Sequence, residues 1–210
     1  MKQTGILFST PMVQALQRGK TVTRRTRGLE EINKEPEKWK FIKKWADENL
    51  YIFERDDGSF WRLKCPYGGK GDMLRIKETW KTEKIFDNTP SREIPYCAII
   101  EYLASPDPII ALTTGKVRPS IFLPLRFSRY FLPLIADPIP ERVQEITYDD
   151  ILDEGWDART DLPFTNRTAG EDARDWFIAL WDFLNAKRGY SWARNCWVWP
   201  LRFNPLTGAR

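Results

Sequence analysis

The chain has 210 residues, of which 42% are hydrophobic and 30% are charged, so it is long enough to bury a core without disulfides or a structural metal. Its formal net charge of +4 is too small to identify a partner. The sequence contains no histidine, which excludes Ser-His-Asp triads, HExxH zinc sites and imidazole-ligated metals. Catalysis would have to use lysine, carboxylate, hydroxyl, phenol or thiol groups, and we expect neither a metal nor a cofactor.

The three cysteines, Cys65, Cys97 and Cys196, are far apart in the chain and form no CxxC pair. This spacing indicates free thiols in a reducing compartment rather than a zinc ribbon or a disulfide framework. The sequence has neither an N-terminal apolar run of signal length nor a stretch of about 18 apolar residues. We therefore expect a cytoplasmic protein with no membrane partner, and the sequence leaves its oligomeric state open.

The first predicted elements surround a basic turn. Residues 6–8 form a short apolar strand, after which Thr10 and Pro11 are suited to the N-cap and first position of a helix. Gly19 stands where a left-handed C-terminal cap is needed. The β-branched residues 21–23 then favour an extended segment.

The highly charged region 26–66 is interpreted as an insertion. Three apolar residues within 39–45 recur at helical spacing and predict a helix there. Two aromatic-rich runs further along flank an Asp-Gly dipeptide at residues 57–58. This pattern predicts a β-hairpin over residues 51–63.

A second strand and a second insertion follow. Residues 73–80 predict a strand whose alternate residues, including Glu78, share one face. Residues 82–115 are interpreted as an insertion of variable loops. The apolar run 96–102 within it predicts a buried strand.

The C-terminal half alternates strands and helices. An apolar run at 132–135 predicts a strand, and Thr147 predicts the N-cap of a short helix that ends at Glu154. Residues 170–186 carry an apolar stripe of helical period. Residues 197–203 predict a closing strand, in which a proline indicates an edge or a bulge. Short strands with intervening helices predict an α+β fold, built as a small mixed barrel with helices across its mouths.

Three segments resemble the ASCH domain family. The run ALQRGKTVTRR at 15–25 resembles the entry motif of that family, GDMLRI at 71–76 resembles one of its strands, and 146–155 resembles its short helix ending in an acidic residue. The segments 118–121 and 189–199 are similar to those of larger, phage-encoded members. The resemblance implies a PUA-like β-barrel in a single domain spanning 1–210, with insertions at about 26–66 and 82–115.

The resemblance also implies an activity. The bacterial N4-acetylcytidine amidohydrolases of this family use a lysine, a threonine and a glutamate, which match Lys20, Thr23 and Glu154 here. It implies a metal-independent amidohydrolase that removes the acyl group from N4-acetylcytidine or a related N4-acylcytidine, with a modified cytidine nucleoside or RNA as partner. The expected binding residues are Arg25, Arg118, Ser120 and, as a reserve carboxylate, Glu78.

Elementary chemistry makes these roles reasonable. A threonine hydroxyl needs a base to take its proton, and a lysine becomes that base when burial lowers its pKa. The neighbouring charges of Arg24 and Arg25 act in the same direction. Glu154, at the C-terminal end of a helix, is expected to have a raised pKa and to protonate the leaving amine of cytosine.

Other interpretations remain open. From local spacing alone, Lys20, Arg24 and Arg25 fit a solvated basic turn, and Glu154 fits a surface residue at a helix end. PUA-like barrels often bind RNA, so a non-enzymatic RNA-binding module is the main alternative for this mildly basic, aromatic-rich chain. A ribonuclease is the third, because some ASCH proteins are implicated in RNA cleavage.

Overall fold

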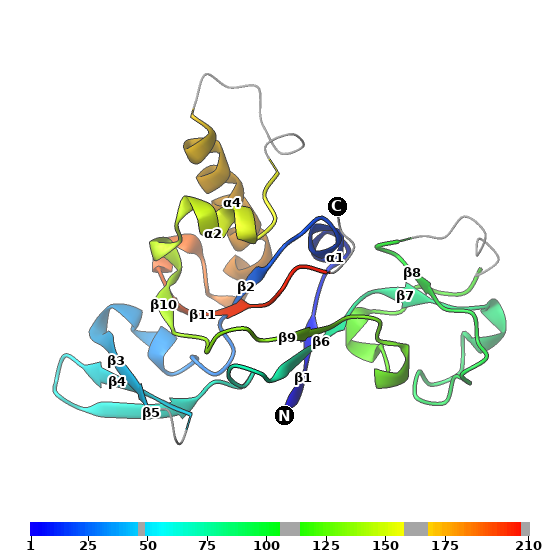
Figure 1. Cartoon of the computed structure of the whole chain (residues 1–210), viewed down its shortest axis with the longest axis horizontal. Coiled ribbons are helices and arrows are strands. Elements are labelled where there is room, and N and C mark those ends of the chain that lie inside the picture. Colours follow the sequence, from blue (N-terminus) through cyan, green and yellow to red (C-terminus); the bar gives the residue numbers. More distant parts are fainter. Residues whose placement is uncertain (46–48, 106–113, 158–167, 207–210) are drawn as a thin grey trace.

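The computed structural model describes residues 1–45, 49–105, 114–157 and 168–206. Within them the chain forms a mixed α+β structure of short strands, gathered in small sheets, and a few helices (Figure 1). The predicted α+β class is therefore confirmed. The described residues form no closed barrel, so the predicted mixed barrel is not confirmed.

The first central sheet has the strand order β1, β6, β9. Strand β1 (Gln3–Leu7) pairs in parallel with β6 (Met73–Lys77), and β6 pairs antiparallel with β9 (Phe131–Pro133). Alternate residues of β6 are buried, as the sequence pattern predicts. The parallel pair requires a long connection between β1 and β6, and the segment 8–72 provides it.

The second central sheet has the order β10, β11, β2. Strand β11 (Trp197–Arg202) lies between β10 (Glu141–Arg142) and β2 (Val22–Arg25) and pairs antiparallel with both. Strand β11 as a whole is therefore central in this sheet. At Pro200, where the sequence predicts an edge or a bulge, β11 has a local edge, because β10 reaches only its first two residues.

Contacts between chain segments beyond β9 and β11 join these two sheets. The N–H of Ile135 donates to the carbonyl of Arg202 at 3.0 Å, and Leu134 forms an antiparallel bridge with Phe203. The side chains of both bridge residues are buried. The two sheets therefore form one curved surface around the main core.

Helices lie beside this surface (Figure 1). Helix α1 (Thr10–Gln17) connects β1 to β2, and its N-cap is Ser9, one residue before the predicted cap. Helix α2 (Tyr148–Asp153) begins with the predicted capping box of Thr147 and ends at Glu154. Helix α4 (Ala169–Asn185) packs its apolar stripe over β11 and α2, as its period predicts.

The first predicted insertion contains a three-stranded sheet and no long helix. Strand β3 (Trp39–Trp45) pairs with β4 (Leu50–Arg55), which pairs with β5 (Phe60–Lys64). The hairpin prediction is confirmed, but the helix predicted over 39–45 is wrong. The spacing of three misled because Ile42 and Trp45 are exposed in the strand, whereas Trp39 and Phe41, two residues apart, pack against the main core.

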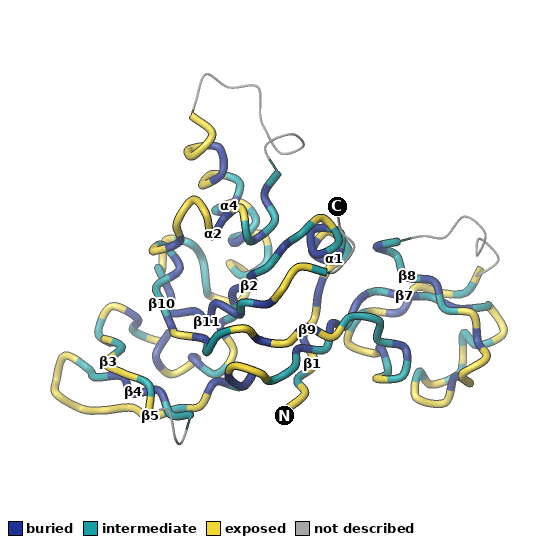
Figure 2. Tube along the Cα trace, viewed as in Figure 1, coloured by how far each residue is buried: buried dark blue, intermediate teal, exposed yellow. Residues whose placement is uncertain are grey.

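This sheet is part of the core. Tyr51 and Phe53 of β4 meet Trp199 and Trp197 of β11 edge to face, with ring centroids 4.7 and 5.2 Å apart. All four rings are buried (Figure 2). Aromatic pairs of this kind add to the stabilisation that burial alone gives.

The second predicted insertion forms a lobe with its own small core, on the right of Figure 1. Strand β7 (Trp80–Lys81) pairs with β8 (Glu101–Tyr102). Only the end of the strand predicted over 96–102 forms, and Tyr96 is exposed. Trp80 instead fills the centre of the lobe against Phe127. None of the helices described in the chain has the length and hydropathy needed to cross a membrane.

Candidate functional site

The end of α1 sets the position of Lys20. The N–H of Gly19 donates to the carbonyl of Leu16 at 3.2 Å, and the N–H of Lys20 donates to that of Ala15 at 3.0 Å. These two bonds form a Schellman cap, which requires the left-handed backbone that Gly19 adopts at φ +113°. The predicted cap is confirmed, and it delivers Lys20 to the start of β2.

Lys20 meets Glu154 inside the protein. Its Nζ donates to the Glu154 carboxylate at 2.5 Å and to the Glu154 backbone carbonyl at 2.6 Å. Only 2% of Lys20 and 5% of Glu154 are exposed. The interpretation of these residues as a solvated turn and a surface helix end is therefore wrong.

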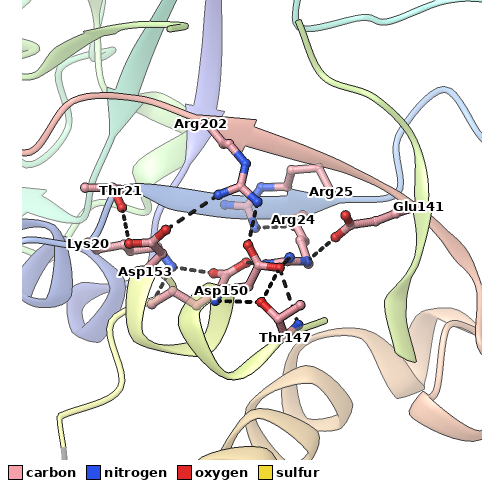
Figure 3. A network of polar contacts seen from close by, with 10 residues as sticks. Lys20, Thr21, Arg24, Arg25, Glu141, Thr147, Asp150, Asp153 and Arg202 are labelled. Atoms are coloured by element: carbon pink, nitrogen blue, oxygen red, sulfur yellow. Dashed lines mark hydrogen bonds and ion pairs between the residues drawn. The ribbon is translucent and has the colours of Figure 1, made fainter. Parts of the chain in front are cut away.

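Arg24 extends this pair into a network (Figure 3). Its guanidinium lies 3.2 Å from Glu154, 2.7 Å from Glu141 and 3.1 Å from Asp150. Arg202 binds the other oxygen of Asp150 at 2.5 Å. Arg24 is 3% exposed, so three carboxylates compensate one fully desolvated cation.

The tip of α2 docks closely on α1 and β2. The N–H of Thr21 donates to the carbonyl of Asp153 at 2.9 Å, and its hydroxyl donates to the Asp153 carboxylate at 2.8 Å. Gly155 follows with φ +102°, and a Cβ there would lie 2.8 Å from the Cβ of Ala15. Glycine is required at this position because the helix tip and α1 leave no room for a side chain.

The environment lowers the pKa of Lys20. Burial is the main cause, and the charges of Arg25 and Arg24 act in the same direction, against the opposing carboxylate of Glu154. This confirms the direction expected from the sequence. Glu154 shares its charge with a permanent cation, Arg24, and so holds the proton of Lys20 less firmly than an unshared carboxylate would.

The pKa of Glu154 moves the opposite way from the prediction. Burial alone would raise it, but the positive charges of Lys20 and Arg24 outweigh burial and hold it below its ordinary value. The expected effect of the helix end is overcome by these nearer charges. The raised pKa predicted for Glu154 is therefore wrong, and the lowered pKa favours its carboxylate form.

Thr23 is buried on the same strand but is not bonded to the pair. It is 1% exposed, and its hydroxyl has no hydrogen-bond partner among the described residues. Successive residues of a strand point to opposite faces, so Thr23 shares a face with Arg25 and not with Arg24. The structure thus brings Lys20 and Glu154 together and leaves the hydroxyl of Thr23 free.

Arg25 lies on the side of β2 away from the carboxylates (Figure 3). Its guanidinium donates to the carbonyl of Leu7 at 3.1 Å and lies over the ring of Phe8, 5.4 Å from its centroid. It lines a cavity of about 470 Å³ between the ends of β1, β2 and α4. Lys20, Thr23 and Glu154 are not among the residues that line this cavity.

The structure places the other predicted binding residues elsewhere. Arg118 lies in the lobe, over the ring of Trp80 and bonded to Ser91 and the carbonyl of Phe86. Ser120 begins a short 3-10 turn of the same lobe. None of the hydrogen bonds or ring contacts of Arg118 involves the Lys20 pair.

Glu78 is engaged in an ion pair of its own. Both of its oxygens accept hydrogen bonds from Arg129 at 2.8 Å, and Glu78 is 1% exposed. Glu78 is buried in this pair, while about a quarter of the Arg129 side chain is exposed. Arg129 therefore binds both oxygens of the carboxylate that the sequence offers as a reserve binding residue.

Sequence reasoning missed Glu141 and Asp150 as members of the network. Asp150 carries a local signal only for capping, because it accepts from Thr147, and its contacts with two arginines depend on tertiary packing. Among the described residues, no group of three or more aspartates, glutamates or cysteines is placed to hold a metal ion. A scan against protein-family models and searches of curated proteins and of solved structures return no match to this chain.

Proposed function

We propose that the protein is an amidohydrolase that removes the acyl group from N4-acetylcytidine or a related N4-acylcytidine. Lys20 is the proposed base, Thr23 carries or positions the nucleophile, Glu154 orients Lys20, and Arg25 contributes to substrate binding. One observation carries the proposal. A lysine with a lowered pKa is held by a buried carboxylate three residues before a buried hydroxyl that has no partner.

The protonation states suit a lysine base. Desolvation favours the neutral amine of Lys20, and a neutral amine accepts the proton of the Thr23 hydroxyl or of a water bound to it. To do so the amine must leave the Glu154 carbonyl, which it contacts in the free protein. The rotatable carbons of a lysine side chain allow this movement.

The proton balance of the reaction follows from the carboxylate state of Glu154. The nucleophile attacks the acyl carbonyl, and the proton it loses passes to Lys20. Collapse of the tetrahedral intermediate breaks the bond to N4, and the ammonium of Lys20 returns the proton to the departing amine. The carboxylate of Glu154 stabilises that ammonium. Where Thr23 is the nucleophile, a water then cleaves the acyl ester on its oxygen; where a water is the nucleophile, the acid leaves as the bond to N4 breaks.

An unpartnered buried hydroxyl supports a role for Thr23 beyond packing. Burying a hydroxyl without a hydrogen bond destabilises a protein by about 1–3 kcal/mol. A valine has nearly the same shape and avoids that penalty. Thr23 also shares a strand face with Arg25, which lines the nearby cavity and marks a route for a substrate.

We also propose a PUA-like barrel for the central strands, open between β1 and β2 in the described residues. The continuity of the two three-stranded sheets through Ile135 and Arg202 supports this assignment. In such an arrangement the tip of α2 and the start of β2 meet at one mouth of the barrel. The Lys20 pair lies at that meeting point.

The test is hydrolysis of N4-acetylcytidine by the purified protein, measured as the release of cytidine. We expect Lys20→Arg to lower kcat by about 10²–10⁴-fold, because arginine keeps the ion pair with Glu154 but cannot become neutral. Thr23→Val should abolish turnover and leave the protein at least as stable as wild type. Thr23→Ser should retain measurable activity, since it keeps the hydroxyl.

The paired variants separate catalysis from folding. A wild-type rate in Lys20→Arg would exclude Lys20 as the base, and a wild-type rate in Thr23→Val would exclude a catalytic role for the Thr23 hydroxyl. If kcat rises with pH, its apparent pKa should lie below the ordinary lysine value of about 10.4. A flat profile between pH 6 and about 10 would contradict a titrating lysine base.

An RNA-binding module is the second candidate function. The observation that favours it is a group of arginines, Arg25, Arg27 and Arg188, around one cavity that no carboxylate lines. Affinity for RNA that falls steeply with added salt, together with no hydrolysis of N4-acetylcytidine, would favour this function over the hydrolase.

A further inference from the structure

The cavity beside Arg25 is built from five separate parts of the chain. The end of β1, the start of α1, the segment after β2, the turn before β6 and the end of α4 all contribute to it. Its volume of about 470 Å³ is within the range of small-molecule sites. Three arginines line it, Arg25, Arg27 and Arg188, and its lining contains no acidic residue.

None of these three arginines forms an ion pair with a described carboxylate. Arg25 donates to two backbone carbonyls, and Arg188 donates to the amide oxygen of Asn185 at 3.4 Å. Arg27 is exposed to solvent at the cavity edge. Three guanidinium groups around one cavity raise the local positive potential, because the residues that line it include no carboxylate.

Two buried hydroxyl side chains also face this cavity without a partner. Tyr67 is 4% exposed and Thr26 is 3% exposed, and both line the cavity. No hydrogen bond joins either hydroxyl to a described residue. Burial raises the pKa of Tyr67, while the charges of Arg25, Arg27 and Arg188, which line the same cavity, act in the opposite direction.

The start of α1 adds a further positive contribution. Ser9, the N-cap, makes no side-chain hydrogen bond, and the first turn of the helix has no acidic residue. Ser9 and Met12 line the cavity. The uncapped N-terminus of an eight-residue helix offers backbone donors and a partial positive charge to an anion.

We propose that this cavity is a binding site for a phosphate group, held by Arg25, Arg27 and Arg188 with the Tyr67 hydroxyl as a further donor. Guanidinium groups bind phosphate oxygens in pairs, and a hydroxyl completes the set of donors. The volume accommodates a mononucleotide and not only the anion.

The site extends the proposed function, on which this step rests, by naming the substrate class. Thr23 and Arg25 share one face of β2, so a phosphate held in the cavity lies on the same side of the strand as the free hydroxyl. The substrate is then an N4-acylcytidine that carries a phosphate, rather than the free nucleoside.

Calorimetric titration tests the site without any turnover. Cytidine, cytidine 5′-monophosphate, cytidine 3′-monophosphate and inorganic phosphate are titrated into the full chain at low ionic strength. We expect at least one monophosphate to bind about tenfold or more tightly than cytidine. The variant Arg27→Gln/Arg188→Gln should lose at least about tenfold in that affinity, and Tyr67→Phe about two- to tenfold.

The matched control is Arg18→Gln/Lys187→Gln, which removes the same charge from two exposed residues, the C-cap of α1 and a residue of the turn after α4, that do not line the cavity. Its affinity for the monophosphate should stay within about twofold of wild type. Equal losses in both double variants would overturn the site, as would equal affinities for cytidine and both monophosphates. Binding of a single-stranded RNA without affinity for any monophosphate or for phosphate would also overturn it.

Turnover distinguishes the site from the proposed function. Faster hydrolysis of an N4-acetylcytidine monophosphate than of N4-acetylcytidine, lost in Arg27→Gln/Arg188→Gln, would support the substrate class. Phosphate-dependent binding with no hydrolysis of either compound would overturn the hydrolase and support the site. Hydrolysis of N4-acetylcytidine and of its monophosphate at equal rates, without phosphate-dependent binding, would overturn the site and support the hydrolase.

Discussion

Arg24 and Arg25 are neighbours in one strand, yet their side chains have opposite environments. Arg24 is buried among Glu141, Asp150 and Glu154, which compensate its charge. Arg25 donates to the carbonyls of Arg24 and Leu7, lies over the ring of Phe8 and lines a cavity. The alternation of a β-strand places these two environments on the two faces of β2.

The contrast separates charges that hold the fold from charges that remain available. A buried cation with carboxylates on each of its nitrogens is a structural element, because removing it leaves uncompensated negative charges. Cations around a cavity with no acidic lining are instead available to a ligand. Lys20 lies before β2 and joins Arg24 through Glu154, while the free hydroxyl of Thr23 shares the strand face of Arg25.

The largest expected effect on stability comes from the face of β2 where three carboxylates surround Arg24. Arg24→Met keeps the length of the side chain but leaves three carboxylates close together without their cation. We expect the free energy of unfolding to fall by about 3–5 kcal/mol, the range for breaking a buried ion pair by removing one partner. Urea denaturation of the variant and of wild type measures this difference.

A control for Arg24→Met is Arg62→Met, which changes an exposed arginine of β5. Its effect should stay within about 0.5 kcal/mol, as for most surface substitutions. Similar losses in both variants would show that the network contributes no more than a surface arginine, and the distinction between the two faces of β2 would then fail.

Acid should reduce the contribution of Glu154, on the same face of β2, to the free energy of unfolding. The pKa of Glu154 is lowered in the folded state, so its contribution is fully present above its ordinary value of about 4.3 and is lost as pH falls through the lowered pKa. We therefore expect the stability difference between wild type and Glu154→Gln to shrink by about 1–2 kcal/mol between pH 5 and pH 3. Denaturation at each pH measures it, and a difference that grew on acidification would contradict the lowered pKa.

The sequence predicts the local structure around the site better than the peripheral structure. Gly19 and Thr147 mark the ends of α1 and α2 because cap geometry depends on only a few neighbouring residues. The strand at 39–45 was predicted as a helix because Ile42 and Trp45, which are exposed, lie at helical spacing from Trp39. The run 96–102 forms a strand only at its last two residues, although Ala98, Ile100 and Tyr102 pack with Trp80 in the core of the lobe.

The site itself was predicted only in part. The resemblance placed Lys20 opposite Glu154, and the structure brings them into contact. The pKa of Glu154 could not be predicted, because its sign depends on Arg24, whose direction from β2 requires the tertiary structure. Arg27 and Arg188 are too far apart in sequence to indicate a shared cavity, although the basic run at 24–27 gave a partial signal.

The smallest expected effect on stability comes from the face of β2 that carries Arg25 and borders the cavity. Arg25→Met removes a bond to the carbonyl of Leu7 and a contact with Phe8, but it also relieves repulsion from Arg188. These opposing effects should leave the free energy of unfolding within about 1 kcal/mol of wild type, while affinity for a cytidine monophosphate falls at least about tenfold. A loss of stability as large as in Arg24→Met, with monophosphate binding unchanged, would make Arg25 a structural residue. That result would remove the functional difference between the two faces of β2.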